Sequence, residues 1–411
     1  MKPICINNYC FDRVHIWVQY DWLVPQFVEL VIEVFYPKNR AANGLVMFSH
    51  GFLIGNDLLF YPKKVAGALL NDNPLFGINP SSYYNYSEAI VEKNWAMGFV
   101  TAAHMQSALI PWVDLGGNPR VGQEAYAAAS YLIKYGATDE FYKIDEHNRN
   151  QSFHDREILN RTRFMKGNNV IFAGHSVGGA HAQAAAVGFE NLRKLGGKSF
   201  RPFNPVIYDR EFIPAYSERM EKWNPEDRAN PVGLLQLSPV DMNIPFIAPG
   251  MKPYRDILSE TGIPELMVVG QCDCATLESS NPPSWSSTSG TPTQFTQLSS
   301  PESWSSVARI EKGAHCGYLT EKSELCKQAD NPSKCKLCPG VETYKPNGAE
   351  TAFTIDMFRR FIRLYPDAGG FQGTFEAWKQ SDFMQWLNRE SPDGTVRLVP
   401  FADGQYVDFA R

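Results

Sequence analysis

Short apolar runs alternate with longer amphipathic stretches along most of this chain. The apolar runs end in glycine, proline or polar residues, a pattern that predicts buried strands. The amphipathic stretches carry apolar residues at helical spacing, and one of them lies between Ser87 as N-cap and Gly98 as stop. The predicted strands span residues 28–37, 44–52, 98–105, 169–174, 232–240, 265–273 and 307–317, and the predicted helices span 87–97, 122–134, 178 onward and 351–365.

This alternation predicts an α/β fold with a mostly parallel central sheet that helices cover on both faces. The sequence shows no internal repeat, so we expect one domain over residues 1–411. Two stretches break the pattern and are predicted insertions, the charged segment 136–167 with a helix of its own and the Ser/Thr/Pro-rich segment 275–306. The second is interpreted as a solvated loop, with a lid carrying Trp285 and Trp304 as the alternative.

A single serine stands between glycines where one predicted strand gives way to a predicted helix. The segment Gly174-His175-Ser176-Val177-Gly178 follows an apolar run and precedes an alanine-rich stretch. A serine on so tight a turn needs a strained backbone, and the flanking glycines let strand and helix approach closely. Functional groups of open parallel sheets gather at this end of the strands. We therefore predict that Ser176 is a nucleophile.

A serine nucleophile needs a base, and two histidines follow Ser176 in the chain. His181 falls inside the helix after the serine and points away from the turn, whereas His315 lies at the last predicted strand and is the better base. The base needs a carboxylate to orient it. Asp273 is favoured because its strand directly precedes that of His315, and Asp241, which also ends a strand, is the alternative acid.

Backbone amides are the predicted donors of an oxyanion hole. The Val177 N–H begins the helix after the serine and is aimed at the place where an oxyanion would form. A second donor should come from the loop after an earlier strand, and in "FSHGFL" the candidate is the Phe52 N–H. His50 in the same loop is predicted to be a structural hydrogen-bonding residue. Chemistry of this kind requires no metal or organic cofactor.

The chain order Ser, Asp, His, with His50-Gly51 upstream, resembles that of the α/β-hydrolase superfamily. The resemblance spans residues 28–365. The stretches "FYP", "GLVMFSHGF", "WAMGFVTAAH" and "GHSVGGA" look most like chlorophyllases, platelet-activating-factor acetylhydrolases, dienelactone hydrolases and cutinase-like polyester hydrolases. Chlorophyllases usually carry arginine where Val177 stands, which argues against that substrate. The resemblance implies the triad and oxyanion donors already named, Ser176, Asp273, His315, Phe52 and Val177.

The chain has eight cysteines, and six of them lie between residues 272 and 338. An even number clustered in this way favours disulfides and an oxidising compartment. Cys272 and Cys274 flank the candidate acid, and Cys316 follows the candidate base. A bridge from one of the first two to Cys316 would tie the two loops together. It would close a loop of about 43 residues, which stabilises by a few kcal/mol in the chain-entropy picture.

The segment 316–340 contributes further candidate disulfide cysteines. Cys326, Cys335 and Cys338 are expected to form a local pair plus a link to Cys5 or Cys10. The alternative for "CKQADNPSKCKLC" is a zinc knuckle, for which one Cys-x-x-Cys without a matching second pair is weak support.

Charge and hydropathy exclude several classes of partner. The net charge of −5, from 39 Lys and Arg against 44 Asp and Glu, favours neither nucleic acid nor an anionic membrane. No apolar run is long enough for a transmembrane helix, and the first residues lack the apolar core of a signal peptide. We therefore expect either an intracellular protein or a sequence that begins after a removed leader. The cysteines favour a secreted protein.

The predicted function is therefore that of a serine hydrolase which cleaves a small or lipid-like carboxylic ester with a hydrophobic acyl or alcohol group. Three alternatives stay open. A peptidase of the same fold usually carries a large accessory domain, an acyltransferase would use the same acyl-enzyme, and a non-catalytic binding protein on this scaffold commonly lacks the serine or the histidine.

Overall fold

The structure is a computed structural model, and it describes part of the chain. The described residues are 4–20, 26–51, 53–55, 75–77, 80–101, 122–136, 140–142, 158–160, 164–197, 206–208, 218–239, 252–270, 272–273, 305–310, 313–321, 326, 330, 349–365, 377–378, 380–389, 396–402 and 405–406. The expectations for Phe52, Asp241, Cys274, Cys335, Cys338, Trp285 and Trp304 lie outside these residues.

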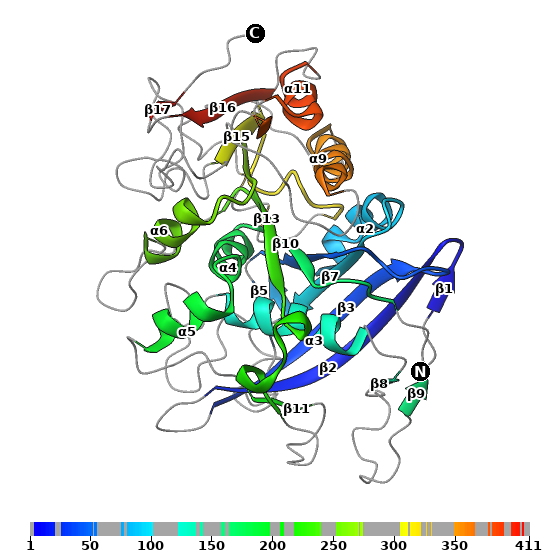
Figure 1. Cartoon of the computed structure of the whole chain (residues 1–411). Helices are drawn as coiled ribbons and strands as arrows, with labels where there is room; N and C mark the ends of the chain where they lie inside the picture. The colour runs from blue at the N-terminus through cyan, green and yellow to red at the C-terminus, as the bar shows by residue number, and fades with distance from the viewer. Residues whose placement is uncertain are drawn as a thin grey trace.

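One mixed β-sheet forms the centre of the molecule (Figure 1). Its main strands follow one another in space as β2 (Tyr9–Tyr20), β3 (Gln26–Pro37), β7 (Ala96–Thr101), β4 (Leu45–Ser49), β10 (Asn169–His175), β13 (Asn230–Leu237), β14 (Glu265–Gly270) and β15 (Ser305–Ile310). Among these strands β3 alone runs against the rest, because it pairs antiparallel with both β2 and β7 while the later pairs are parallel. This is the α/β-hydrolase fold, and the predicted fold class is confirmed.

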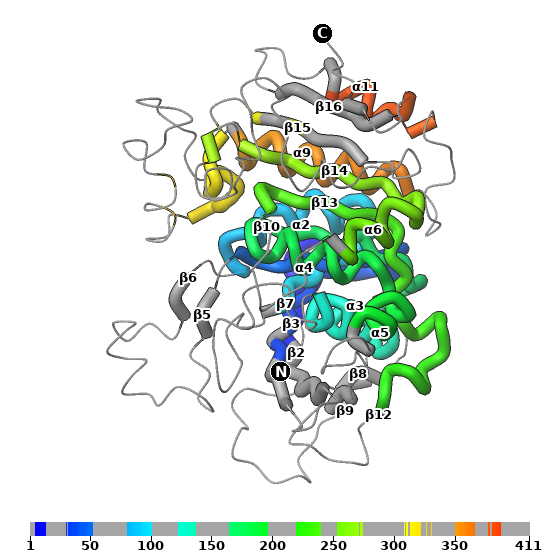
Figure 2. The backbone as a smooth tube through the Cα atoms, turned by 90° about the vertical axis from the view of Figure 1, so that its left-hand side faces the viewer, coloured from blue at the N-terminus to red at the C-terminus, as the bar shows by residue number. Residues whose placement is uncertain are grey.

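Further strands extend both edges of the sheet. They are β1 (Ile4–Ile6), β11 (Val206–Tyr208) and β12 (Glu218–Arg219) beyond β2, and β16 (Val396–Ala402) and β17 (Gln405–Tyr406) beyond β15. All of these pairs are antiparallel. Figure 2 shows β13 and β14 side by side toward this second edge. In the order of the sheet, β15 and β16 follow them.

Helices cover both faces of the sheet (Figure 1). One face carries α3 (Gln123–Gly136), α4 (Val177–Ala185), α5 (Phe189–Gly197) and α6 (Lys252–Thr261), and the other carries α2 (Asn85–Val91), α9 (Ala349–Phe361) and α11 (Asp382–Arg389). Successive side chains of a strand point to opposite faces. In β4, Leu45 and Met47 accordingly pack in the first cluster and Val46 and Phe48 in the second. A strand that is buried on both faces needs the continuous apolar run from which it was predicted.

The short elements complete the described chain. They are the hairpins β5 (Leu53–Gly55) with β6 (Leu75–Gly77) and β8 (Glu140–Tyr142) with β9 (Ile158–Asn160), and the 3-10 turns η1 (Pro80–Tyr83), η6 (Met220–Lys222), η7 (Pro225–Asp227) and η8 (Ile362–Leu364). The predicted insertion 136–167 thus contributes a hairpin, and its predicted helix does not occur in the residues that are described there. The prediction of a single domain over residues 1–411 stays a prediction.

The predicted helix over residues 87–97 is wrong at both ends. The helix α2 begins at Asn85, so Ser87 lies inside it rather than at its N-cap. The helix α2 stops at Val91, because Asn94 adopts a left-handed backbone with φ of 63° and turns the chain into β7. Trp95 is buried at this turn and Gly98 lies inside the strand, so the apolar residues before Gly98 mark a buried strand rather than a last helical turn. A short apolar run fits either element by periodicity alone.

A disulfide joins Cys5 and Cys10, which corrects the predicted link from this end of the chain to the late cysteines. The two residues face each other in the β1–β2 hairpin, so their side chains meet across the turn. Among the described residues, no helix combines the length and the apolar character that a membrane span requires.

Candidate active site

Ser176 lies at the junction between β10 and α4 in a strained backbone, with φ of 58° and ψ of −123°. Left-handed φ is unusual for a residue other than glycine, and such outliers concentrate at functional sites. A Cβ on Gly174 would meet the Gly178 carbonyl oxygen at 2.1 Å, and a Cβ on Gly178 would meet the Ser49 carbonyl oxygen at 2.1 Å. The glycines on either side of the serine are therefore required by the close approach of strand and helix.

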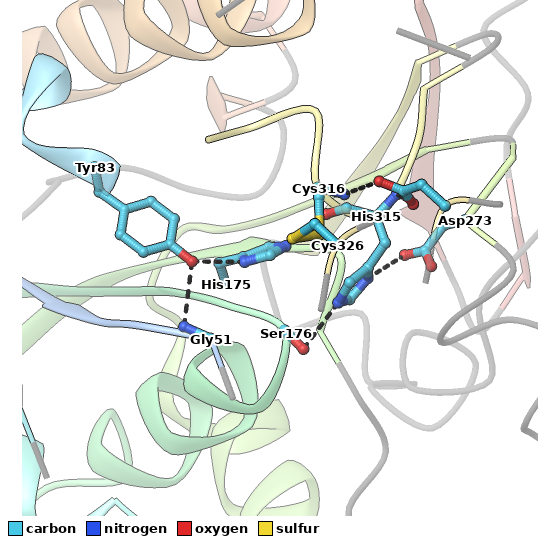
Figure 3. Close-up of a disulfide and its surroundings, with 9 residues drawn as sticks. Gly51, Tyr83, His175, Ser176, Asp273, His315, Cys316 and Cys326 are labelled. Atoms are coloured by element: carbon cyan, nitrogen blue, oxygen red, sulfur yellow. Dashed lines mark hydrogen bonds and ion pairs between the residues drawn. A yellow bond between two sulfur atoms is a disulfide. The ribbon is translucent and has the colours of Figure 1, made fainter. Parts of the chain in front are cut away.

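The structure brings Ser176, His315 and Asp273 together in one hydrogen-bonded row (Figure 3). His315 Nε2 lies 2.9 Å from Ser176 Oγ, and His315 Nδ1 lies 2.9 Å from Asp273 Oδ2. A carboxylate only accepts hydrogen bonds, so Nδ1–H donates to Asp273 and Nε2 is left to accept the serine proton. All three residues are buried. This geometry matches that of a nucleophile, a base and an orienting acid.

Opposing effects set the pKa of the His315 imidazole. Burial lowers this pKa, because it disfavours the charged ring. The negative charge of Asp273, the hydrogen bond to it and the charge of Asp330 act in the other direction, and together they raise the pKa of His315 above its usual value. These carboxylates therefore favour the protonated form of the His315 imidazole.

Backbone contacts hold the acid loop beside the base loop. The Cys272 N–H donates to the Gly313 carbonyl at 2.8 Å, and a Cβ on Gly270 would meet the same carbonyl oxygen at 2.4 Å. The predicted disulfide between Cys272 or Cys274 and Cys316 is wrong, because Cys316 is bonded to Cys326 with an S–S distance of 2.03 Å. Cys272 is itself disulfide-bonded. The loops are thus joined through backbone contacts rather than through that bridge.

The zinc interpretation of the late cysteines is also wrong for Cys326, since its sulfur is taken up by the disulfide to Cys316. In the part of the chain that the structure describes, no group of three His, Cys, Asp or Glu residues is arranged to hold a metal ion.

Of the two predicted oxyanion donors, the structure describes Val177. Its N–H belongs to the first residue of α4, where the helix dipole favours negative charge, and its residue neighbours Ser176 directly. One residue before Phe52, the Gly51 N–H already donates to the Tyr83 hydroxyl at 3.2 Å. This bond fixes the start of the loop from which the second donor would come.

A buried chain of hydrogen bonds behind the row was missed from sequence (Figure 3). His175 Nε2 lies 2.6 Å from the His315 carbonyl oxygen and Nδ1 lies 2.7 Å from the Tyr83 hydroxyl. Burial lowers the pKa of His175 to about 3, so the ring is neutral, Nε2–H donates to the carbonyl and Tyr83 donates to Nδ1. His175 therefore links the base turn to the Gly51 loop. In the sequence, the position of His175 directly before Ser176 was the one indication of this role.

The sequence analysis also considered two other histidines, His50 and His181. His50 is buried, and its Nδ1 donates to the Gly51 carbonyl oxygen at 2.6 Å, which suits the structural role predicted for it. His181 is buried within α4. Two acids that sequence reasoning did not single out, Asp330 and Glu350, hold backbone amides of the His315 turn.

No family model matches the chain, and no curated protein sequence matches it either. A comparison with solved structures does give matches. A dienelactone hydrolase-like promiscuous phosphotriesterase from metagenomic libraries is 10% identical, with 87% of this chain and 98% of that chain covered and a TM-score of 0.39. A propionate-bound esterase from Thermogutta terrifontis is 9% identical, with 84% and 93% covered and a TM-score of 0.39. An esterase from Butyrivibrio proteoclasticus is 13% identical, with 84% and 97% covered and a TM-score of 0.33. Likenesses this distant do not assign an activity to the chain.

Proposed function

We propose that the protein is a serine hydrolase which cleaves carboxylic esters with a hydrophobic acyl or alcohol group. The observation that carries the proposal is the row Ser176, His315, Asp273, with 2.9 Å between each pair of bonded atoms and the serine in a left-handed backbone. Ser176 follows β10, Asp273 follows β14 and His315 follows β15. β14 and β15 are neighbours, and β13 lies between β10 and β14. All three residues come after the carboxyl ends of parallel strands, where such sheets carry their functional groups.

The chemistry follows from the positions of the protons. Ser176 Oγ attacks the ester carbonyl while His315 Nε2 takes the hydroxyl proton, and Asp273 stabilises the imidazolium that results. The Val177 and Phe52 amides hold the oxyanion of the tetrahedral intermediate. The imidazolium then gives its proton to the leaving alcohol, and an acyl-enzyme remains. A water molecule repeats the sequence with His315 as base, and it releases the carboxylic acid and the free serine.

The disulfides bear on where the protein works. Cys5–Cys10 and Cys316–Cys326 are both formed, which suits an oxidising compartment. We propose a secreted or extracytoplasmic protein, with a small or lipid-like ester as substrate.

The pH dependence of kcat/KM is expected to follow the protonation of His315 in the free enzyme. The imidazole acts as base only when it is neutral, so activity is lost as pH falls through its pKa and is present above it. Because the neighbouring carboxylates raise this pKa above the usual histidine value, the midpoint of the acidic limb should lie above about 6.5. A profile of kcat/KM against pH checks this. A limb centred near the usual carboxylate range would contradict it.

The direct test of the function is hydrolysis of p-nitrophenyl esters from acetate to palmitate by the purified full chain. We expect turnover, and the acyl length with the highest kcat/KM measures the acyl pocket. Hydrolysis of a peptide p-nitroanilide in place of every ester would favour a peptidase. Transfer of the acyl group to an added alcohol, faster than to water, would favour an acyltransferase. A protein inactive on all of them would be a binding protein on this scaffold.

A further inference from the structure

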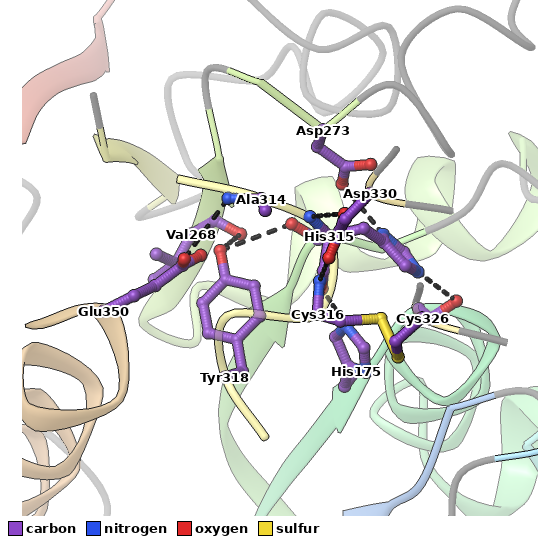
Figure 4. A network of polar contacts seen from close by, with 12 residues as sticks. His175, Val268, Asp273, Ala314, His315, Cys316, Tyr318, Cys326, Asp330 and Glu350 are labelled. Carbon is purple, nitrogen blue, oxygen red and sulfur yellow. Dashed lines mark hydrogen bonds and ion pairs between the residues drawn. A yellow bond between two sulfur atoms is a disulfide. The ribbon is translucent and has the colours of Figure 1, made fainter. Parts of the chain in front are cut away.

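The backbone on either side of the His315 side chain is held by one carboxylate. Asp330 Oδ1 accepts the His315 N–H at 2.7 Å, and Asp330 Oδ2 accepts the Cys316 N–H at 2.9 Å (Figure 4). Bonds from backbone amides to an ionised carboxylate are among the stronger hydrogen bonds in proteins. With both oxygens engaged on consecutive amides, the carboxylate fixes the orientation of the peptide plane from which the imidazole projects.

A disulfide joins the segment of Asp330 to the same turn. Cys316, whose amide Asp330 binds, is bonded to Cys326, and the Asp330 N–H donates to the Cys326 carbonyl oxygen at 2.9 Å. The bridge, the short stretch after Cys326 and the two carboxylate bonds therefore form one closed ring. Figure 4 shows the disulfide and Asp330 on the backbone of the His315 turn, while Asp273 approaches the imidazole itself.

Other side chains complete the hold on this turn. Glu350 Oε2 accepts the Ala314 N–H at 3.2 Å, and His175 donates to the His315 carbonyl oxygen at 2.6 Å. With the Asp330 bonds, three consecutive amides of the turn end on carboxylate oxygens. The loop carrying the base is thus held by side chains rather than by strand or helix hydrogen bonds, and a change in one of these side chains acts directly on the base.

Asp330 also acts on the imidazole by its charge. That charge is one of the influences that raise the pKa of His315. Burial raises the pKa of Asp330 itself to about 6, while the charge of His315 and the two amide bonds oppose the rise and Asp273 adds to it. Glu350, whose pKa burial raises well above its usual value, is the other acid that interacts with Asp330. With a pKa of about 6, Asp330 is mostly ionised at neutral pH.

We propose that Asp330, locked in place by the Cys316–Cys326 disulfide, is a positioning residue for His315: a second carboxylate that sets the orientation of the base through its backbone and supports its protonated form. The inference rests on the proposed function, in which His315 is the base. It assigns to the late cysteines a role at the site that is different from the bridge between acid and base loops that the sequence suggested.

The test is Asp330→Asn in the full chain. An asparagine keeps the size of the side chain but replaces one accepting oxygen by an NH₂ group, which would meet a backbone N–H donor with another donor. We expect kcat to fall by about tenfold to a hundredfold with little change in KM, because a small displacement of a catalytic group costs a factor of this order. Asp356→Asn on α9, a half-exposed carboxylate that pairs with Arg360, is the matched control and should leave both constants unchanged.

The pH profile separates positioning from a general loss of structure. Without the Asp330 charge the pKa of His315 should fall, so the acidic limb of kcat/KM should move to lower pH in Asp330→Asn. A variant that lost activity merely by misfolding would show a lower rate with an unmoved limb, and that result would overturn the inference.

A measurement that does not depend on activity keeps this inference apart from the proposed function. Titration of the His315 imidazole by NMR, assigned by comparison with His315→Gln, should give a lower pKa in Asp330→Asn than in the wild type. If the wild type hydrolyses no ester but this shift is found, the function fails and the positioning of His315 by Asp330 stands. If the wild type is active and neither the pKa of His315 nor kcat changes in the variant, the positioning role is wrong.

The disulfide supplies a second, independent variant. We expect Cys316→Ala with Cys326→Ala to lower kcat and to move the acidic limb in the same direction as Asp330→Asn, because the ring that holds Asp330 is opened. Cys5→Ala with Cys10→Ala removes the other described disulfide, in a hairpin away from the site, and should leave the profile as in the wild type. Equal profiles for both double variants and the wild type would overturn the role of the Cys316–Cys326 bridge.

Discussion

Replacing Ser176 with alanine is expected to lower kcat for ester hydrolysis by about 10⁴-fold to 10⁶-fold, the range that loss of a serine nucleophile produces in enzymes of this kind. Ser176 is the nucleophile of the proposed mechanism, since His315 and Asp273 are hydrogen-bonded to each other and serve to transfer and stabilise the proton. What remains should be the small rate that oxyanion donors and binding supply without a nucleophile. The check is steady-state hydrolysis of the best p-nitrophenyl ester found for the wild type.

A matched control for this change is Ser259→Ala on α6, where the same atom is removed from a serine that bonds only within its own helix, to the Asp256 carbonyl. It should keep the wild-type rate. Near-wild-type hydrolysis by Ser176→Ala, with the control also unchanged, would remove Ser176 from the mechanism and with it the proposed acyl-enzyme.

Asp273→Asn should lower kcat by about 10⁴-fold while the fold is kept, since loss of the orienting carboxylate leaves the histidine in the wrong tautomer. The asparagine NH₂ group would donate to His315 Nδ1 and thereby move the ring proton to Nε2. That proton would then face Ser176 Oγ, so the base could no longer accept the serine proton. Activity is measured across pH together with thermal unfolding, which should stay close to that of the wild type.

The same substitution at the alternative acid decides between the two candidates. Asp241→Asn should leave kcat near the wild-type value, because Asp273 Oδ2 already lies 2.9 Å from His315 Nδ1. If Asp241→Asn abolished turnover while Asp273→Asn kept it, Asp241 would be the orienting acid and the contact to Asp273 would be structural.

The parts of the fold that sequence could predict are those with a local cause. A strand buried on both faces must be apolar at nearly every position, so β4, β10, β13 and β14 were found from their composition. The turn at Ser176 was found because its glycines are needed where strand and helix touch. β2 was missed, since its sequence "YCFDRVHIWVQY" mixes charged and apolar residues along an antiparallel strand near the edge of the sheet.

The order of strands in space could not be obtained in this way. β7 lies between β3 and β4, although β3 and β4 are consecutive in the apolar pattern of the sequence. That neighbourhood is decided by long-range pairing and by the helices that must cover both faces, neither of which leaves a mark within a single run of residues.

The residues of the candidate site likewise fall into those that local sequence predicts and those that it does not. Ser176, Asp273 and His315 were proposed from strand ends and chain order, and the structure places them within hydrogen-bonding distance of one another. The supporting residues were not found, because Tyr83 lies in a segment without any motif and the segment of Asp330 was interpreted for its cysteines alone. Both residues reach the site only after folding. The disulfide pairing failed for a related reason: proximity in the folded chain decides it, and spacing along the sequence does not.

The most direct measurement is covalent labelling with a fluorophosphonate, which reacts with a serine only when a base activates its hydroxyl. We predict one adduct per chain of the wild type, mapped by peptide mass spectrometry to Ser176, and none when His315 is replaced by glutamine. An unlabelled wild type, or an adduct on any other residue, would contradict the account at its centre.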